Sequence, residues 1–130
     1  MILADVKDFL KTKIDCPHWY VGKRDMAKEQ SITIYPTKGP APIVPVGGLK
    51  NSSYRTKAVS VLVHWGRNCT PAEEKAQEVY DCLLGQAGVI GGREVVKFDL
   101  RTDAPIGMGT DEKGFYEYVI NFVIYYKKER

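Results

Sequence analysis

The sequence predicts one α/β domain of the α+β type over residues 1–130: a mostly antiparallel mixed sheet of about five strands with two helices packed on one face. Segments in which every second residue is apolar, as in strands, outnumber the two segments with helical spacing. The 130 residues are 44% hydrophobic and 27% charged, which is typical of a single soluble domain with one core. The apolar runs are too short to cross a bilayer, so no membrane association is expected.

Two segments have the spacing of amphipathic helices, and the first lies near the start of the chain. There Leu3, Val6, Leu10 and Ile14 fall on one helical stripe, with Phe9 beside them. This stripe predicts a helix that packs on the sheet.

The second helix has the strongest local signal in the chain. Thr70 is expected to be its N-cap, Pro71 its first residue and Glu73 its third, and together they predict a capping box. Gly85 is placed to end the helix in a left-handed conformation. The predicted apolar stripe of this helix consists of Ala72, Ala76, Val79, Tyr80 and Leu83.

Strands are expected at residues 18–22, 31–35, 54–65, 93–100 and 116–126. The alternation in the third strand predicts one face with Val59, Val61, Val63 and Trp65. In the fourth strand, Val96, Phe98 and Leu100 are predicted to share one face, opposite Val95, Lys97 and Asp99.

The last strand is mostly apolar on both faces. One face is predicted to carry Tyr116, Tyr118, Ile120, Phe122, Ile124 and Tyr126, and the other Phe115, Glu117, Val119, Asn121, Val123 and Tyr125. Two helices can blanket only one face of a sheet, so the other face is expected to be left for a partner.

A long loop is predicted at residues 36–53. It holds four of the seven prolines, at positions 36, 40, 42 and 45, and three of the twelve glycines, at 39, 47 and 48. Loops of this length usually bind something or are disordered. Ile43, Val44, Val46 and Leu49 would give it apolar anchors, which favours a docking arm over a floppy insertion.

The arm region is also basic. Residues 30–72 contain no acidic residue, although the net charge of the whole chain is only +3. This surface would suit an acidic protein patch or a nucleic acid backbone, or its charges simply keep a loop solvated. The basic residues of the segment are Lys38, Lys50, Arg55, Lys57 and Arg67. The candidate partner-binding residues are Lys38, Ile43, Val44, Val46, Lys50, Arg55 and Lys57.

No catalytic, cofactor or metal site is predicted, and the chain is not expected to be an enzyme. The three cysteines lack the spacing of a zinc or redox motif and are expected to be buried or half-buried free thiols. His18 and His64 lie in strand segments, where they are expected to be satisfied, partly buried imidazoles rather than bases. Glu94 and Lys97, three apart in a strand, would lie on opposite faces and could not share a metal-bound water.

Three features together resemble one known family. They are the order of elements, the proline-rich loop that follows Ser31-Ile-Thr-Ile-Tyr-Pro36, and the end segment. In that end segment a strand closes in Asp103-Ala-Pro, a glycine-rich turn contains Thr110-Asp111, and the aromatic strand from Phe115 to Tyr126 follows. The chain is similar, over most of its length, to the phage minor capsid or tail terminator family, whose members complete siphovirus tails.

The resemblance implies a structural virion protein without a cofactor. Such proteins form a ring, usually hexameric, on the last turn of the tail tube, where they stop tube polymerisation and present the surface that joins the head. The expected partners are other copies of the chain, the tail tube protein and a head completion or connector protein, with DNA only passing through the ring. The expected location is the head-proximal end of the tail, after assembly in the host cytoplasm. The alternatives are another head–tail connector or tail component, or a small DNA-binding accessory protein.

Overall fold

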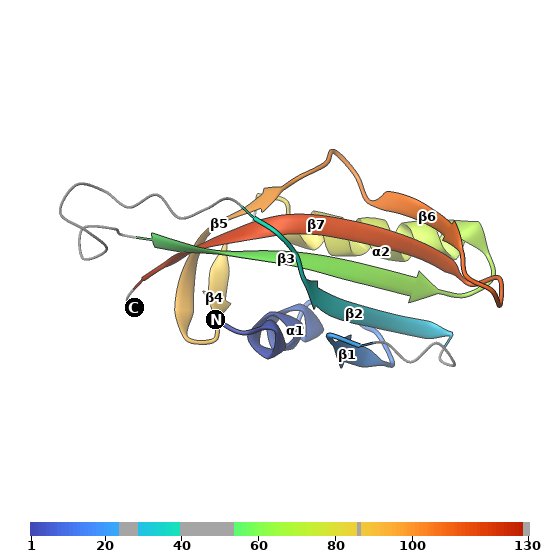
Figure 1. Ribbon diagram of the computed structural model, residues 1–130, viewed down its shortest axis with the longest axis horizontal. Coiled ribbons are helices and arrows are strands. Elements are labelled where there is room, and N and C mark those ends of the chain that lie inside the picture. Colours follow the sequence, from blue (N-terminus) through green and yellow to red (C-terminus); the bar gives the residue numbers. More distant parts are fainter. Residues whose placement is uncertain (24–28, 40–53, 86, 129–130) are drawn as a thin grey trace.

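The computed structural model describes residues 1–23, 29–39, 54–85 and 87–128. Two helices pack on a seven-stranded sheet, which confirms the predicted α+β class with more strands than expected (Figure 1). The helices are α1 (Leu3–Lys11) and α2 (Cys69–Leu83). The strands are β1 (Trp19–Val21), β2 (Gln30–Pro36), β3 (Tyr54–Trp65), β4 (Gly88–Ile90), β5 (Arg93–Leu100), β6 (Ile106–Thr110) and β7 (Tyr116–Lys127).

The sheet is built around the two long strands β3 and β7. The strand order is β1-β2-β3-β7-β5-β4, and only β1 and β2 pair in parallel. β5 pairs with the last part of β7 and β6 with its first part, so β5 and β6 follow one another along the same edge of β7. The sheet is therefore mostly antiparallel and mixed, as predicted.

The sequence pattern did not predict β4 and β6. β4 has only three residues, and a two-residue turn of Gly91 and Gly92 joins it to β5. Both glycines have positive φ values, 57° and 77°, which is the geometry of a tight hairpin turn. β6 contains Gly107 and Gly109, so it lacks the β-branched and aromatic residues by which a strand is recognised.

Both helices cover the same face of the sheet. α2 packs on β3 and β7, whereas α1 packs on β1 and β2 (Figure 1). The predicted apolar stripe of α2 is buried throughout. Of the first predicted stripe, Val6 and Leu10 are buried and Leu3 is half-buried, whereas Ile14 is buried but lies after the end of α1. On the sheet, the predicted face of β3 with Val59, Val61, Val63 and Trp65 and the face of β7 with Ile120, Phe122 and Ile124 meet these helices in one core, and Phe122 is fully buried.

The capping box prediction is wrong. α2 begins at Cys69 with Asn68 as its N-cap, no side chain caps it, and Thr70 is already inside the first turn. The first residue of the helix also makes a tertiary contact: the Sγ atom of Cys69 lies 3.5 Å from the hydroxyl oxygen of Tyr118. Pro71 is tolerated because the first helical amides have no intrahelical partner. The predicted C-terminus is confirmed: Gly85 follows the helix with a φ of 68°.

The predicted alternation of β5 is also wrong at its start. The pairing of β5 with β7 shifts between Val95 and Lys97, which is a β-bulge. The extra residue turns Val95 into the core, where it is 3% exposed, and leaves Val96 53% exposed. Val95 therefore shares the core with Phe98.

The second face of the sheet is partly covered by the chain itself. No helix in the described ranges lies on it, as predicted, and Val119, Asn121 and Tyr125 are half-buried there. However, Val123 on this face is only 1% exposed. A hypothetical Cβ atom on Gly39 would lie 2.7 Å from the Cβ of Ala58 and 3.8 Å from a methyl group of Val123. The expectation that the second face is left for a partner is therefore wrong around Val123, which the chain itself covers.

Candidate assembly surface

The predicted partner-binding residues fall in two groups. Lys38 follows β2, and Arg55 and Lys57 lie near the start of β3; Lys38 and Arg55 are exposed and Lys57 is half-buried. The remaining predicted residues, Ile43, Val44, Val46 and Lys50, lie outside the described residues.

The start of β3 lies beside the end of β7. Arg55 is directly opposite Tyr126, and Lys57 is opposite Ile124. Antiparallel pairing of β5 with β7 brings the first half of β5 to the same end of the sheet. Residues that are about 40 to 70 positions apart in the sequence therefore lie at one end of the sheet, on either of its faces.

Two further lysines lie at this end of the sheet. The ammonium of Lys97 lies 4.7 Å from the ring centroid of Tyr125, and Lys127 forms an ion pair of 3.2 Å with Glu94. Sequence reasoning missed both, because only the strand pairing brings them to the end of the sheet that carries Arg55 and Lys57. Arg55 and Lys57 lie on the helix-covered face, opposite Tyr126 and Ile124, whereas Lys97 and Lys127 lie on the second face, opposite Tyr125 and Tyr54. We call this end of the sheet, with Lys38, Arg55, Lys57, Lys97 and Lys127, the basic sheet end.

The segment after β2 fixes where the arm leaves the domain. The amide N–H of Thr37 donates to the carbonyl of Ala58, and Gly39 then passes close over Ala58. Any side chain at position 39 would collide with this strand, so the close approach requires glycine. The arm therefore begins on the second face of the sheet, beside the basic sheet end.

A buried hydrogen bond between two side chains anchors the opposite end of the sheet. Nε2 of His64 lies 2.8 Å from Oδ2 of Asp111, and the two side chains are 1% and 3% exposed. Oδ1 of Asp111 accepts hydrogen bonds of 2.9 Å from the amides of Lys113 and Phe115. The ring of Phe115 packs edge-on against His64, with centroids 5.0 Å apart. His64 is therefore a buried imidazole, and Asp111 orders the turn between β6 and β7.

The charge state of Asp111 follows from these contacts. Burial raises the pKa of its carboxyl group, but the hydrogen bonds from His64, Phe115 and Lys113 outweigh burial and hold the pKa below its ordinary value. The carboxylate is therefore ionised at neutral pH and can only accept hydrogen bonds. Nε2 of His64 must then carry the hydrogen.

Ser31, His64 and Asp111 are the residue types of a hydrolytic triad, and Ser31 lies directly opposite His64 in the sheet. Ser31 and His64 are each 1% exposed, so a substrate cannot reach the hydroxyl group. This cluster therefore supports the fold.

The cysteines do not form a reactive centre. Cys16 and Cys82 are half-buried free thiols, as predicted, whereas Cys69 is exposed. Burial raises the pKa of Cys82 to about 11, so this thiol is protonated and unreactive at neutral pH. In the described ranges, no cluster of three or more metal-ligating side chains occurs.

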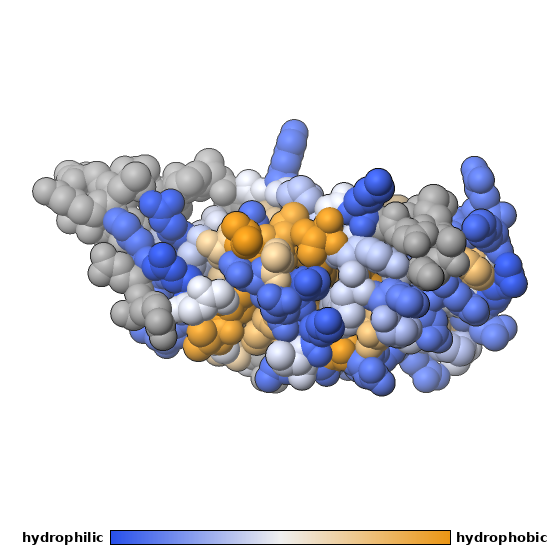
Figure 2. Space-filling view, turned by 90° about the horizontal axis from the view of Figure 1, so that it is seen from below, coloured by the Kyte–Doolittle hydropathy of each residue, from blue (hydrophilic) through white to orange (hydrophobic). Residues whose placement is uncertain are grey.

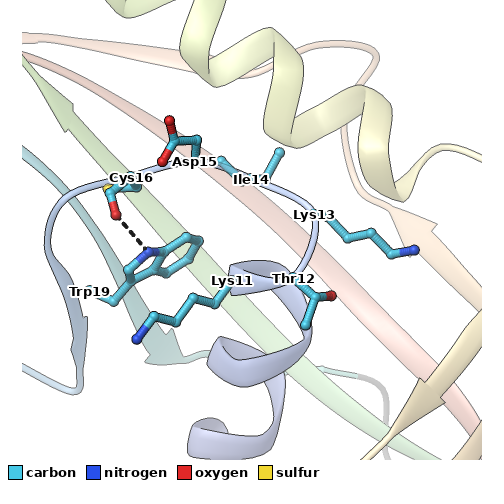
Figure 3. Close-up of a pocket in the computed structure, with 7 residues that line it drawn as sticks. All are labelled: Lys11, Thr12, Lys13, Ile14, Asp15, Cys16 and Trp19. Carbon is cyan, nitrogen blue, oxygen red and sulfur yellow. Dashed lines mark hydrogen bonds between the residues drawn. The ribbon is translucent and has the colours of Figure 1, made fainter.

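A hollow of about 390 Å³ lies at the end of α1 (Figure 3). Lys11 and Lys13 point in different directions there, and Asp15 points away from both. The indole N–H of Trp19 donates to the carbonyl of Cys16 over 3.1 Å, so this donor is already used. These side chains do not converge on a common point, as a small-molecule site requires.

A second hollow of about 240 Å³ lies beside the start of α2. Glu73 and Glu74 contribute two carboxylates to its lining, and Tyr118 contributes a phenol from β7. The complete lining is Glu73, Glu74, Gln77, Ala104, Pro105 and Tyr118.

Exposed apolar side chains are dispersed over several elements. Ile2, Val89, Val96 and Met108 are all more than half exposed, and they belong to four different parts of the fold. Figure 2 shows one face of the molecule, on which hydrophobic patches are separated by hydrophilic side chains.

The described part of the chain thus combines a sealed polar cluster with exposed charged surfaces. The chain belongs to the bacteriophage tail terminator protein family, whose model matches residues 5–128. No curated protein and no solved structure matches the chain. The protein is therefore a structural component of the phage virion. No helix among the described residues is long and apolar enough to cross a membrane.

Proposed function

We propose that this protein caps the tail tube as a ring of identical subunits, ends tube polymerisation and forms the surface to which the head is joined. The observation that carries this proposal is the family match over residues 5–128, which spans nearly the whole domain. A hexamer is the ring size that the family resemblance implies. The ring would sit at the head-proximal end of the tail after assembly in the host cytoplasm.

The proposed partners are the tail tube protein on one side of the ring and a head completion or connector protein on the other. DNA would only pass through the centre. Contact with a tube subunit would be made by the arm from Pro36 to Lys57, with the apolar anchors Ile43, Val44 and Val46. Lys38, Lys50, Arg55 and Lys57 would steer the arm toward an acidic surface.

The position of Gly39 supports this role for the arm. Gly39 holds the start of the arm against Ala58, so the arm leaves a rigid strand pair at a fixed point. A defined starting point reduces the entropy that the arm loses when it docks.

The direct test reverses two charges, with Lys38→Glu and Lys50→Glu in one variant. This variant should give longer, uncapped tails and fewer joined particles in electron micrographs, while its circular dichroism spectrum stays unchanged. A variant with Lys11→Glu and Lys23→Glu has the same change in net charge away from the arm and should behave like the parent. Normal tail length and normal head joining in the Lys38/Lys50 variant would refute the role of the arm.

Salt provides a second readout. Steering by exposed charges is screened beyond roughly 10 Å at 0.1 M salt, so association with assembled tubes should slow as salt rises. The bound complex should persist, because apolar contacts hold it. A gel shift tests the DNA-binding alternative: tight, salt-sensitive DNA binding by the parent protein would favour it over tube capping.

A further inference from the structure

Three strands of the sheet have only one neighbouring strand in the part of the chain that the structure describes. β1 pairs with β2, β4 with β5 and β6 with β7, and β1 lies on the opposite side of the sheet from β4 and β6 (Figure 1). The outer edge of such a strand presents backbone N–H and C=O groups that can pair with a strand of another chain. These edges are therefore candidate contacts between copies of the protein.

The hydrogen bonds of β1 show which of its backbone groups point outward. The carbonyl of His18 and the amide of Gly22 both bond to β2, over 3.0 and 2.8 Å. Backbone groups of successive residues in a strand point to alternate sides, so Trp19 and Val21 direct theirs away from β2. The side chain of Val21 is 38% exposed. The outer edge of β1 therefore carries the N–H and C=O groups of Trp19 and Val21.

β6 lacks the charged side chains and the proline that commonly protect an edge strand. All five of its residues are exposed, and Ile106 and Met108 are 37% and 59% exposed. A bulge also protects an edge, but here the register with β7 shifts only after Gly107. The start of β6 is therefore a regular and accessible edge.

β1 and β6 lie at the same level of the sheet. The register leads from Tyr20 on β1 through Thr33, Leu62 and Val119 to Ile106 on β6. Directly paired residues point to the same side of a sheet, so these five side chains form one row on the second face. Tyr20 and Ile106 are the two ends of this row.

β4 lies at a different level. Val95 pairs with Gly88 of β4 on one side and with Tyr126 of β7 on the other. Tyr126 lies seven residues beyond Val119, which is roughly 23 Å at about 3.3 Å per residue. A contact between β4 and β1 would shift neighbouring copies by this distance along the strands, whereas β6 meets β1 without a shift.

The chain directions of β1 and β6 also match. β1 is parallel to β2, and the three pairings that lead from β2 through β3 and β7 to β6 are antiparallel. β1 and β6 therefore run in opposite directions. When a second copy lies beside the first with its sheet in the same orientation, its β6 is antiparallel to β1 of the first copy.

We propose that β6 of one copy pairs antiparallel with β1 of a second copy, so that the apolar row of the second face continues from Tyr20 to Ile106 of the next copy. A contact between two different edges is head-to-tail, and its repetition closes a ring when the rotation between copies permits it. The inference rests on the proposed function, because it identifies the contact between copies in the proposed ring.

Two blocked variants and their mixture test this contact. Ile106→Lys with Met108→Lys puts two charges on the edge of β6, and Val21→Pro removes an outward N–H of β1, which an edge strand tolerates. Each variant alone keeps one usable edge and should lose at least about tenfold in association. In an equimolar mixture, β1 of the first variant meets β6 of the second, so dimers should form but nothing larger.

The matched control carries Leu84→Lys with Val96→Lys, which adds the same two charges at exposed apolar positions outside both edges and should assemble like the parent. Circular dichroism checks the fold of each variant. If Val21→Pro changes the spectrum, Val21→Lys replaces it, because this side chain is exposed.

Sedimentation velocity, with and without assembled tail tubes, measures the association of each sample. Variants that stay monomeric alone and form dimers when mixed would support the contact. Parental association of either variant, larger species in the mixture, no dimer in the mixture, or a parent that associates under neither condition would overturn it.

Tube capping is measured separately, as tube length in the presence of the parent protein. A parent that limits tube length while the mixture forms no dimer would overturn this contact and leave the proposed function standing. A parent that associates as predicted but leaves tube length unchanged would refute capping and leave the contact standing.

Discussion

Replacement of Asp111 by alanine should strongly destabilise the domain. Its carboxylate accepts three hydrogen bonds, from Nε2 of His64 at 2.8 Å and from the amides of Lys113 and Phe115 at 2.9 Å. The Lys113 amide is exposed and can turn to water, whereas the donors of His64 and Phe115 are partly buried. A buried donor without a partner costs about 1–3 kcal/mol, so two of them predict a loss of about 4 kcal/mol.

The same carboxylate predicts a pH dependence. Its pKa in the folded protein lies below the ordinary value of 3.8, so the unfolded chain takes up a proton first as the pH falls. The stabilisation by Asp111 is then fully present above about pH 5 and is lost as the pH falls through the folded pKa. Asp111→Asn cannot ionise, so its difference in stability from the parent should be largest near neutral pH and smaller at pH values below 3.8.

Urea denaturation followed by circular dichroism measures both effects. Glu112→Ala removes an exposed acidic residue from the same turn and should change the free energy of unfolding by less than about 0.5 kcal/mol. An Asp111→Ala variant as stable as the Glu112→Ala control would refute the assigned role. A difference between the parent and Asp111→Asn that does not change with pH would refute the assigned charge state.

Four further substitutions test the fold by the same denaturation assay. Gly39→Ala places a Cβ atom 2.7 Å from the Cβ of Ala58 and should cost about 1–3 kcal/mol; an unchanged midpoint would mean that the chain can move away from this strand. Thr70→Ala should cost less than about 0.5 kcal/mol, because no side chain caps α2, and a loss near 1 kcal/mol would restore the predicted capping box. Val95→Ala should cost about 2 kcal/mol and Val96→Ala less than about 0.5 kcal/mol; equal losses would contradict the bulge.

Much of the core could be predicted because hydrophobic periodicity is a local property of the chain. The alternation in β3 and β7 and the stripe of α2 match the buried residues of the structure. The strand β6 could not be predicted in this way, because Gly107 and Gly109 contribute no side chains to a pattern. A similar limit applied to the start of α2, where Asn68 and Thr70 are both good N-cap residues and the sequence does not decide between them.

Sequence reasoning predicted only some of the basic residues at this end of the sheet. The absence of acidic residues between positions 30 and 72 pointed to Arg55 and Lys57, which the structure places on the basic sheet end. Lys97 and Lys127 carry no local signal, and they reach the same end of the sheet, on its second face, only through the pairing of β5 and β7 with β3.

The sequence alone determined the class of the domain, its main strands, the two helices and the family resemblance, because short-range spacing and composition carry that information. The tertiary structure alone decided that the residue before Lys97 bulges out of the sheet and that Gly39 passes over Ala58. It also decided that His64 meets Asp111 across 47 positions. The physical reason is common to all three. Each depends on which backbone lies next to which, and the packing of the whole chain sets this adjacency.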